Sequence, residues 1–399
     1  MLRHAMDIAK YIRSKYPSIP IIWGGSHVTA VRQVTLEHHL VDYIVWGEGE
    51  HVLPDLLEAI IAGEGFEKIK GIGYKVGDKT FITAKSEYND IERVFDLPYH
   101  LIDMNKYARK MLIGGDRWFP LITSRGCPFK CKFCHNTSEV YPMRLMRLHT
   151  LEHIVSNINR LIDDYDCDAV GFEDELTAAN DKRMLEICEA IKTGVKKQLS
   201  YRITTRVDLL LRLKDSTLKL MRDTGFVQVT YGIESGSQRV LDYMDKGIKI
   251  KQVLECDERM NKFGFFKSYH FMMGIPTETI AEMKESIKLL TYLGRNSKTS
   301  PYPCSQAPTF VPLPDTGLYA AALKFGFKPP QKLEDWTTLD SEEVLASREK
   351  IRPWLTEDQA RFAVESDKAI AKASLPFIGK EADHKEIDQA LDVLEKRVH

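Results

Sequence analysis

Short apolar runs alternate with helical patterns from Phe119 to about residue 316, and this alternation constrains the fold more than any other feature. Strands separated by helices pair in parallel in one sheet. Six strands are predicted with helices between them, which is consistent with an incomplete α/β barrel. The predicted strands are Leu121–Ser124, Ala169–Glu173, Tyr201–Thr205, Phe226–Ile233, Phe265–Met273 and Gln306–Val311.

A second strand–helix segment precedes this region. Ile21–Trp23 and Val41–Trp46 are apolar runs that end in Gly-rich turns, so we predict two parallel strands. Residues 71–83 predict a hairpin that turns at Gly77. Near the other end of the chain, Thr356 and Gln359 have the spacing of a capping box, which predicts the start of a helix.

Composition indicates an ordinary globular protein. The 399 residues carry a net charge of −1, which argues against a broad nucleic-acid surface. No apolar stretch approaches the length of a membrane span, and the N-terminus lacks the apolar core of a signal peptide. We therefore expect a cytoplasmic protein with neither a membrane nor a nucleic acid as its partner.

Three of the seven cysteines, Cys127, Cys131 and Cys134, lie within eight residues, just after the first predicted barrel strand. This spacing lets one loop turn several thiolates toward one point, and thiolates are the ligands that iron–sulfur clusters require. A cluster of four irons held by three cysteines leaves one iron open. An open iron is what a catalytic cluster needs.

Two other interpretations of the cysteines exist. A zinc site could use the three cysteines with His135, although adjacent residues such as Cys134 and His135 rarely both reach one tetrahedral ion. An electron-carrier cluster would need a fourth cysteine. The remaining four, Cys167, Cys188, Cys256 and Cys304, are scattered along the chain and are typical of buried thiols.

The motif C-x3-C-x-Phe-C after a strand, preceded by Thr123-Ser124-Arg125-Gly126, resembles the radical S-adenosylmethionine (SAM) superfamily. The resemblance implies a 4Fe-4S cluster held by the three cysteines. It also implies that SAM chelates the open iron and is cleaved to a 5′-deoxyadenosyl radical. By the same resemblance, Phe133 lies near the SAM adenine.

Other strand ends extend this resemblance across the barrel. The segment Thr205-Arg206-Val207-Asp208 resembles a stretch of cobalamin-type and methylthiotransferase-type members, and Arg206 could bind a carboxylate or pair with Asp208. Residues 232–237 resemble the family's Gly-Ile-Glu-Ser-Gly-Ser string, and residues 274–279 resemble its Gly-x-Pro-x-Glu-Thr turn. Besides Phe133, the residues expected to surround SAM are Glu173, Asp174, Glu175, Arg206, Glu234, Ser235, Gly274 and Pro276.

The segment around Gly24 and Gly25 resembles the second half of the cobalamin-binding domain that precedes many radical SAM cores. In that domain the Gly-Gly loop approaches the nucleotide tail of cobalamin. The first half of the domain is absent here, and so is the Asp-x-His-x-x-Gly motif that supplies the lower cobalt ligand. The sequence therefore supports cobalamin binding only in part, and we expect this segment to be truncated.

We therefore expect a radical SAM enzyme of the cobalamin-associated branch that methylates or cyclises an unactivated carbon of a small biosynthetic substrate. An external one-electron reductant of the flavodoxin or ferredoxin type would supply the electron. A methylthiotransferase-like enzyme is the alternative, together with the zinc or carrier module above. The expected α/β parts are a partial Rossmann segment (residues 1–85), a linker (86–117), a partial (β/α)6 radical SAM barrel (118–316) and a mostly helical C-terminal region (317–399).

Overall fold

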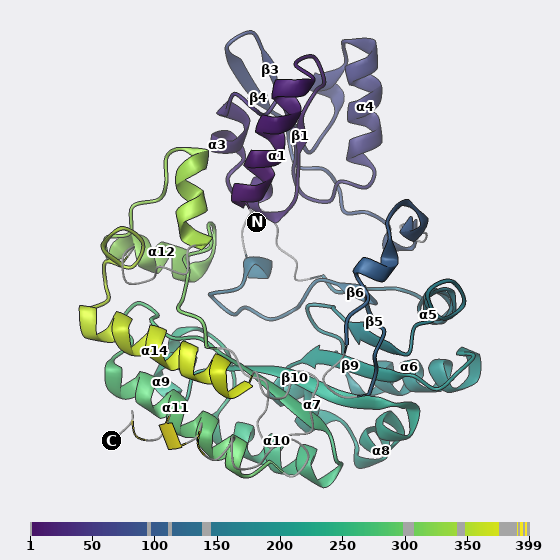
Figure 1. Ribbon diagram of the computed structural model, residues 1–399, viewed down its shortest axis with the longest axis vertical. Helices are drawn as coiled ribbons and strands as arrows, with labels where there is room; N and C mark the ends of the chain where they lie inside the picture. The colour runs from purple at the N-terminus through teal and green to yellow at the C-terminus, as the bar shows by residue number, and fades with distance from the viewer. Residues whose placement is uncertain are drawn as a thin grey trace. The chain divides into compact units, whose positions relative to one another are not determined.

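The computed structural model describes residues 2–93, 97–110, 114–137, 145–297, 307–340 and 348–374, with residues 389, 392, 393 and 396. The chain forms two compact units (Figure 1). The first comprises Met1–Val94, Phe133–Pro142 and Val311–Trp354, and the second comprises Phe95–Lys132, Met143–Phe310 and Leu355–His399. In the described part of the chain, no helix has the length and apolarity needed to span a membrane. The division into four parts stays a prediction.

The first unit contains a four-stranded sheet in the order β1-β2-β3-β4. Strands β1 (Ile22–Trp23) and β2 (Tyr43–Val45) pair in parallel, as predicted. Strands β3 (Ile72–Val76) and β4 (Lys79–Ile82) form the predicted antiparallel hairpin. The helices of this unit are α1 (Leu2–Lys15), α2 (Ser26–Ala30), α3 (Arg32–Glu37), α4 (Val52–Ala62), α12 (Gly317–Lys324), α13 (Arg348–Ile351), η1 (Phe66–Lys68), η2 (Ile91–Arg93), η5 (His135–Thr137) and η6 (Leu333–Asp340).

The second unit is built on a five-stranded parallel sheet in the order β11-β10-β9-β8-β5. This confirms the predicted α/β fold with a parallel sheet, and the described residues form no closed barrel. A short antiparallel pair, β6 (Ser124–Arg125) and β7 (Arg147–Leu148), follows β5. The sheet strands are β5 (Trp118–Leu121), β8 (Ala169–Phe172), β9 (Ser200–Thr205), β10 (Phe226–Glu234) and β11 (Phe266–Phe271).

Two predicted strands differ from the structure. The predicted strand Leu121–Ser124 corresponds to β5, which ends at Leu121. It ends there because a carboxylate, Asp174, accepts the backbone N–H groups of Thr123 and Ser124, so those groups do not pair with a neighbouring strand. The predicted sixth strand begins at Gln306, outside the described residues, and in the rest of it Thr309 forms a single parallel bridge with Met273.

The two faces of the second sheet have different side chains because consecutive residues of a strand point to opposite faces. One face packs against helices through buried aromatic residues, among them Phe172, Tyr201 and Phe226. The opposite face is polar. Arg202 on β9 and Gln228 on β10, for example, are paired neighbours there. The helices and helical turns of this unit are α5 (Leu151–Tyr165), α6 (Asp181–Gly194), α7 (Val207–Arg212), α8 (Asp215–Thr224), α9 (Gln238–Tyr243), α10 (Ile250–Lys262), α11 (Ile280–Arg295), α14 (Glu357–Ser374), η3 (Tyr99–Leu101) and η4 (Met104–Lys106).

Figure 1 shows helices α6, α8 and α10 along the second sheet. The predicted capping box is present at the start of α14, where the Thr356 and Gln359 side chains each accept a hydrogen bond from the other residue's backbone N–H. The spacing of Ile387, Leu391, Leu394 and Val398 also predicts an apolar stripe on a final helix, and these four residues lie outside the described residues.

Candidate functional site

The cysteine loop begins directly after β6, and its other end is hydrogen-bonded to the segment after α9. Cys127 is half-buried and Cys131 is buried, with 7% of its surface exposed. The next residue, Lys132, donates its backbone N–H to the carbonyl of Met244 at 2.8 Å. The loop is thus fixed at both ends, at β6 and at the segment after α9.

The thiols of this loop fit a bound metal cluster. The pKa of Cys127 is raised, mainly because burial disfavours the charged thiolate and also because Cys131 lies nearby. A hydrogen bond from the backbone at Phe129 and the positive charge of Arg206 act in the opposite direction. Thiols crowded in a buried loop deprotonate when a metal cation is present to bind them. Cys134, half-exposed, follows three residues after Cys131, and Phe133 before it is partly buried. His135, the fourth ligand of the zinc alternative, is exposed.

The three acids after β8 have different partners. Asp174, 4% exposed, accepts hydrogen bonds from Thr123 N at 2.5 Å, Thr123 Oγ1 at 2.5 Å and Ser124 N at 3.0 Å. Burial raises its pKa to about 6, against these hydrogen bonds, which lower it. Glu175 accepts a hydrogen bond from Gly126 N at 3.2 Å. Two of the acids therefore hold the backbone that leads into the cysteine loop.

The third acid, Glu173, lies on the polar face of the sheet. It forms an ion pair with Arg202, whose guanidinium lies 4.8 Å from the centre of the Trp118 ring. Gly171 leaves the space that the indole occupies, since a Cβ there would come within 2.5 Å of it. Near Arg202, His270 has an exposed side but is otherwise surrounded by protein, and the resulting desolvation lowers its pKa.

The carboxyl end of β10 carries a buried ion pair beside a glycine. Glu234 has a positive φ of 73° and accepts a hydrogen bond from Lys246 Nζ at 2.8 Å. A Cβ at Gly232 would lie 2.0 Å from Glu234 Oε1 and 2.9 Å from Lys246 Nζ, so a larger residue there would displace the ion pair. Ser235 is fully buried and its hydroxyl lies 3.3 Å from the Ser286 hydroxyl on α11. Ser235 thus contacts a helix of its own unit.

The turn after β11 contains the predicted Gly274 and Pro276. Gly274 has a φ of +78°, and its N–H donates to Glu278 Oε2 at 2.6 Å. Ile275 N donates to the same oxygen at 3.2 Å. The Glu278 carboxyl is buried, which raises its pKa to about 7. The carboxyl therefore closes this turn through two backbone N–H groups.

The parallel sheet brings most of the predicted residues to one edge. The segments that carry Glu173, Arg206, Ser235 and Gly274 all follow the carboxyl ends of neighbouring parallel strands. In open parallel sheets, this edge is where ligands bind. The structure thus places these strand-end segments of the second unit along one edge.

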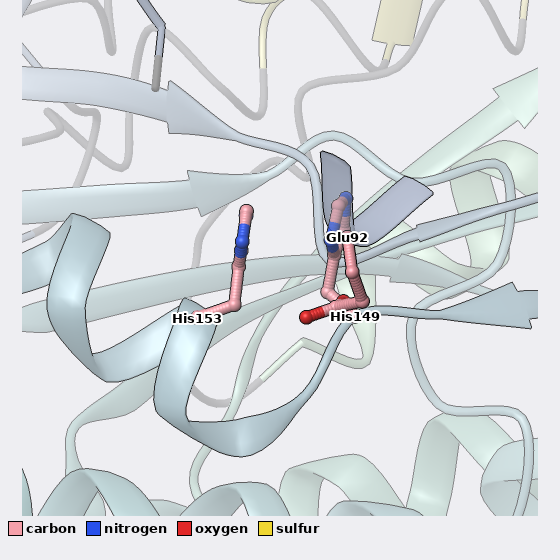
Figure 2. Close-up of side chains that lie close together, drawn as sticks. All are labelled: Glu92, His149 and His153. Atoms are coloured by element: carbon pink, nitrogen blue, oxygen red, sulfur yellow. The ribbon is translucent and has the colours of Figure 1, made fainter. Parts of the chain in front are cut away.

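Some residues near this edge were not predicted from the sequence. Lys246 pairs with Glu234 and Arg202 pairs with Glu173. Lys246 belongs to a Lys-Gly pair that extends the family-like string after residue 237, but neither cation was predicted as a site residue. His149 and His153 stack with their ring centres 3.9 Å apart (Figure 2). Both rings belong to the second unit, and His149 N donates to the Thr123 carbonyl at 3.0 Å. His149 precedes Thr150, the N-cap of α5, and His153 lies in the first turn of the helix, so no helical spacing marks the pair in the sequence.

The two predicted cobalamin-loop glycines lie in the first unit. Gly24 and Gly25 follow β1, and Gly25 has a φ of +96° at the start of α2. They line a largely apolar cavity of about 830 Å³, together with residues of β1, β2 and α4. Since a Cβ on Gly25 would meet nothing within 4 Å, the loop leaves open space at this point.

Comparison with known proteins agrees with this arrangement. Residues 121–290 match the family model described as the Radical SAM superfamily. An uncharacterised methyltransferase of Pyrococcus horikoshii is 28% identical over 84% of this chain and 70% of its own length. The anaerobic magnesium-protoporphyrin IX monomethyl ester cyclase of Cereibacter sphaeroides is 30% identical over 71% of this chain. The match spans 46% of the cyclase, so the chain corresponds to about half of that protein.

A solved structure supports the same fold. The cobalamin-dependent SAM radical enzyme OxsB, with aqua-cobalamin and SAM bound, matches with a TM-score of 0.71 at 16% identity. The match covers 99% of this chain and 61% of OxsB. At this identity the likeness shows the fold alone.

Proposed function

Residues 121–290 form a radical SAM domain, and from this premise we propose that Cys127, Cys131 and Cys134 hold a 4Fe-4S cluster at which SAM is cleaved reductively. The cysteine loop carries this proposal, because it follows the first strand of a parallel sheet whose other strand ends carry acidic and glycine-rich turns. A cluster held by these cysteines would supply the one electron needed for the cleavage of SAM to methionine and a 5′-deoxyadenosyl radical.

The residues around SAM fall into two groups. We propose that Phe133, Glu173, Glu175, Glu234, Gly274 and Pro276 surround SAM. Asp174 and Ser235 belong to the same shell, but their side chains are held by other residues of the unit: Asp174 by Thr123 and Ser124, and Ser235 next to Ser286. These two, together with Glu175, which accepts the Gly126 N–H, therefore shape the loops that touch SAM.

The substrate is proposed from the relatives. Their names describe methylation and cyclisation, and a methylation or cyclisation of an unactivated carbon in a small biosynthetic molecule fits this chain. The electron would come from an external flavodoxin or ferredoxin, which is consistent with our proposal of a cytoplasmic location. Neither a membrane nor a nucleic acid is proposed as a partner.

Cobalamin remains a proposal for the first unit. The cavity beside Gly24 and Gly25 is apolar and open, as a loop that approaches a large planar ligand requires. The described residues offer no established lower ligand for cobalt in that cavity. Titration of the chain with aqua-cobalamin, followed by the visible absorption of the corrin, measures this binding.

The test of the proposed function is anaerobic reconstitution with iron and sulfide, followed by incubation with SAM and dithionite. We expect about four irons and four sulfides per chain and the formation of 5′-deoxyadenosine. A variant with all three loop cysteines changed to Ala should lose both. Cys188→Ser, which changes a fully buried thiol on α6, is the matched control and should retain both.

The result also separates the alternatives. A colourless protein with one zinc per chain would contradict the proposal and support a zinc module. Cluster assembly without SAM cleavage would support an electron carrier. Transfer of sulfur together with the methyl group to a substrate would identify the methylthiotransferase-like alternative.

A further inference from the structure

Arg206 is buried at the start of α7, and each of its three guanidinium nitrogens has a partner. Nε donates to Asp208 Oδ1 at 2.9 Å, and Nη2 donates to the carbonyl of Lys246 at 2.6 Å. Nη1 donates to Cys131 Sγ at 3.3 Å. These three hydrogen bonds use three of the five guanidinium N–H groups and fix the side chain against the cysteine loop.

The same side chain also holds the cysteine loop by stacking. The guanidinium carbon lies 3.7 Å from the centre of the Phe129 ring, which is between Cys127 and Cys131 in the sequence. Stacking on an aromatic ring and hydrogen bonding to a sulfur together fix the charge at one position. Arg206 is 5% exposed, so water screens this charge little.

We propose that Arg206 is a positioning residue that raises the reduction potential of the cluster by donating a hydrogen bond to the Cys131 thiolate, which is a different role from binding SAM. The inference rests on the proposed function, because it requires that Cys131 is a cluster ligand. Nothing in it depends on which substrate the enzyme uses.

The physical basis is the charge that reduction adds. Accepting an electron makes a thiolate-bound cluster more negative, and a fixed cation with an N–H group directed at a ligand sulfur stabilises that state. Asp208 opposes the effect, since its carboxylate, 2.9 Å from Nε, neutralises part of the guanidinium charge. Changes to the two residues should therefore move the potential in opposite directions.

The experiment is an EPR-monitored redox titration of the reconstituted full chain with dithionite and mediators. Arg206→Gln should lower the midpoint potential enough to reduce the ratio of reduced to oxidised cluster about tenfold at a fixed potential, which corresponds to about 59 mV for one electron. Asp208→Asn should raise the midpoint potential. A residue that only stabilised the fold would not produce shifts of opposite sign.

Arg222→Gln is the matched control. Arg222 is on α8, and its partners are the Phe226 carbonyl and the Phe265 ring instead of the loop. We expect the midpoint potential of the cluster in this control variant to equal that of the wild type within the error of the titration. Iron content is measured for every variant so that potentials are compared only between proteins that hold the cluster.

Each outcome decides the proposal. Equal potentials for wild type, Arg206→Gln and Asp208→Asn would overturn it while leaving the proposed function intact. If Arg206→Gln assembles no cluster, the Asp208→Asn variant is the deciding test. A midpoint potential of Asp208→Asn that is unchanged or lower than that of the wild type then overturns the proposal. A wild-type chain that assembles no cluster overturns both the proposal and the proposed function.

Discussion

Buried carboxyl groups at strand ends hold turns of the second unit through backbone N–H groups. Asp174 binds the N–H groups of Thr123 and Ser124, and Glu278 binds those of Gly274 and Ile275. In both cases burial raises the pKa of the carboxyl, because desolvation disfavours the charged form. These groups therefore make the stability of the site depend on pH.

The free energy of unfolding contributed by Glu278 should fall as the pH rises. Its pKa is about 7 in the folded protein and 4.5 as the ordinary value, so the native state holds the proton more tightly. The contribution is complete below about pH 4.5 and is lost as the pH rises through about 7. Glu278→Gln keeps an oxygen for the two N–H groups and does not titrate.

Urea denaturation of wild type and Glu278→Gln across this pH range measures the effect. The stability of the variant relative to wild type should increase with pH. Asp174 titrates in both proteins and cancels in the difference. A difference that stays constant over the range would contradict the assignment.

At the scale of elements, close packing between β10 and α11 depends on one glycine. A Cβ at Gly236 would lie 2.4 Å from the carbonyl oxygen of Glu285 and 2.6 Å from Ser286 N. Both are backbone atoms of a helix, which cannot move without shifting α11. The glycine thus fixes how closely the strand-end turn approaches this helix.

Gly236→Ala should destabilise the protein by about 3 kcal/mol, at the upper end of the cost of overpacking, because the clash is with backbone. Gly264→Ala is the control: its Cβ would meet nothing within 4 Å, and only its φ of +72° opposes the change. That control should cost about 1–2 kcal/mol. Chemical denaturation compares them, and equal costs would show that α11 can shift.

A buried ion pair joins β11 to α10. Lys267, fully buried, donates to Asp257 Oδ1 at 2.6 Å, and burial lowers the pKa of Lys267. Lys267→Met should cost about 3–5 kcal/mol of unfolding free energy, because the carboxylate remains buried without its cation. Adding Asp257→Asn to that variant should recover part of the loss in a denaturation experiment. A double variant no more stable than Lys267→Met would contradict this explanation.

The sequence predicted elements better than side-chain partners. Hydrophobic alternation located β8, β9, β10 and β11 to within a few residues, since it reflects burial that each strand imposes locally. The end of β5 was misplaced because the carboxylate that ends it is about fifty residues away. The alternative that Arg206 pairs with Asp208 was confirmed, whereas its contact with Cys131 depends on tertiary structure that no local pattern encodes.

At the scale of the whole molecule, the account depends on one property of the cysteine loop. Three cysteines leave one iron of a 4Fe-4S cluster without a protein ligand, and SAM would occupy it. An electron-carrier cluster with four protein ligands would have no such position. The two cases differ in how the reduced cluster responds to SAM.

The EPR spectrum of the dithionite-reduced cluster, recorded with and without SAM, tests this directly. We predict a one-electron-reduced cluster signal whose g values change when SAM is added, and no signal in the variant that lacks the three loop cysteines. A cluster signal that is identical with and without SAM, or a reconstituted protein with no signal and bound zinc, would contradict the account.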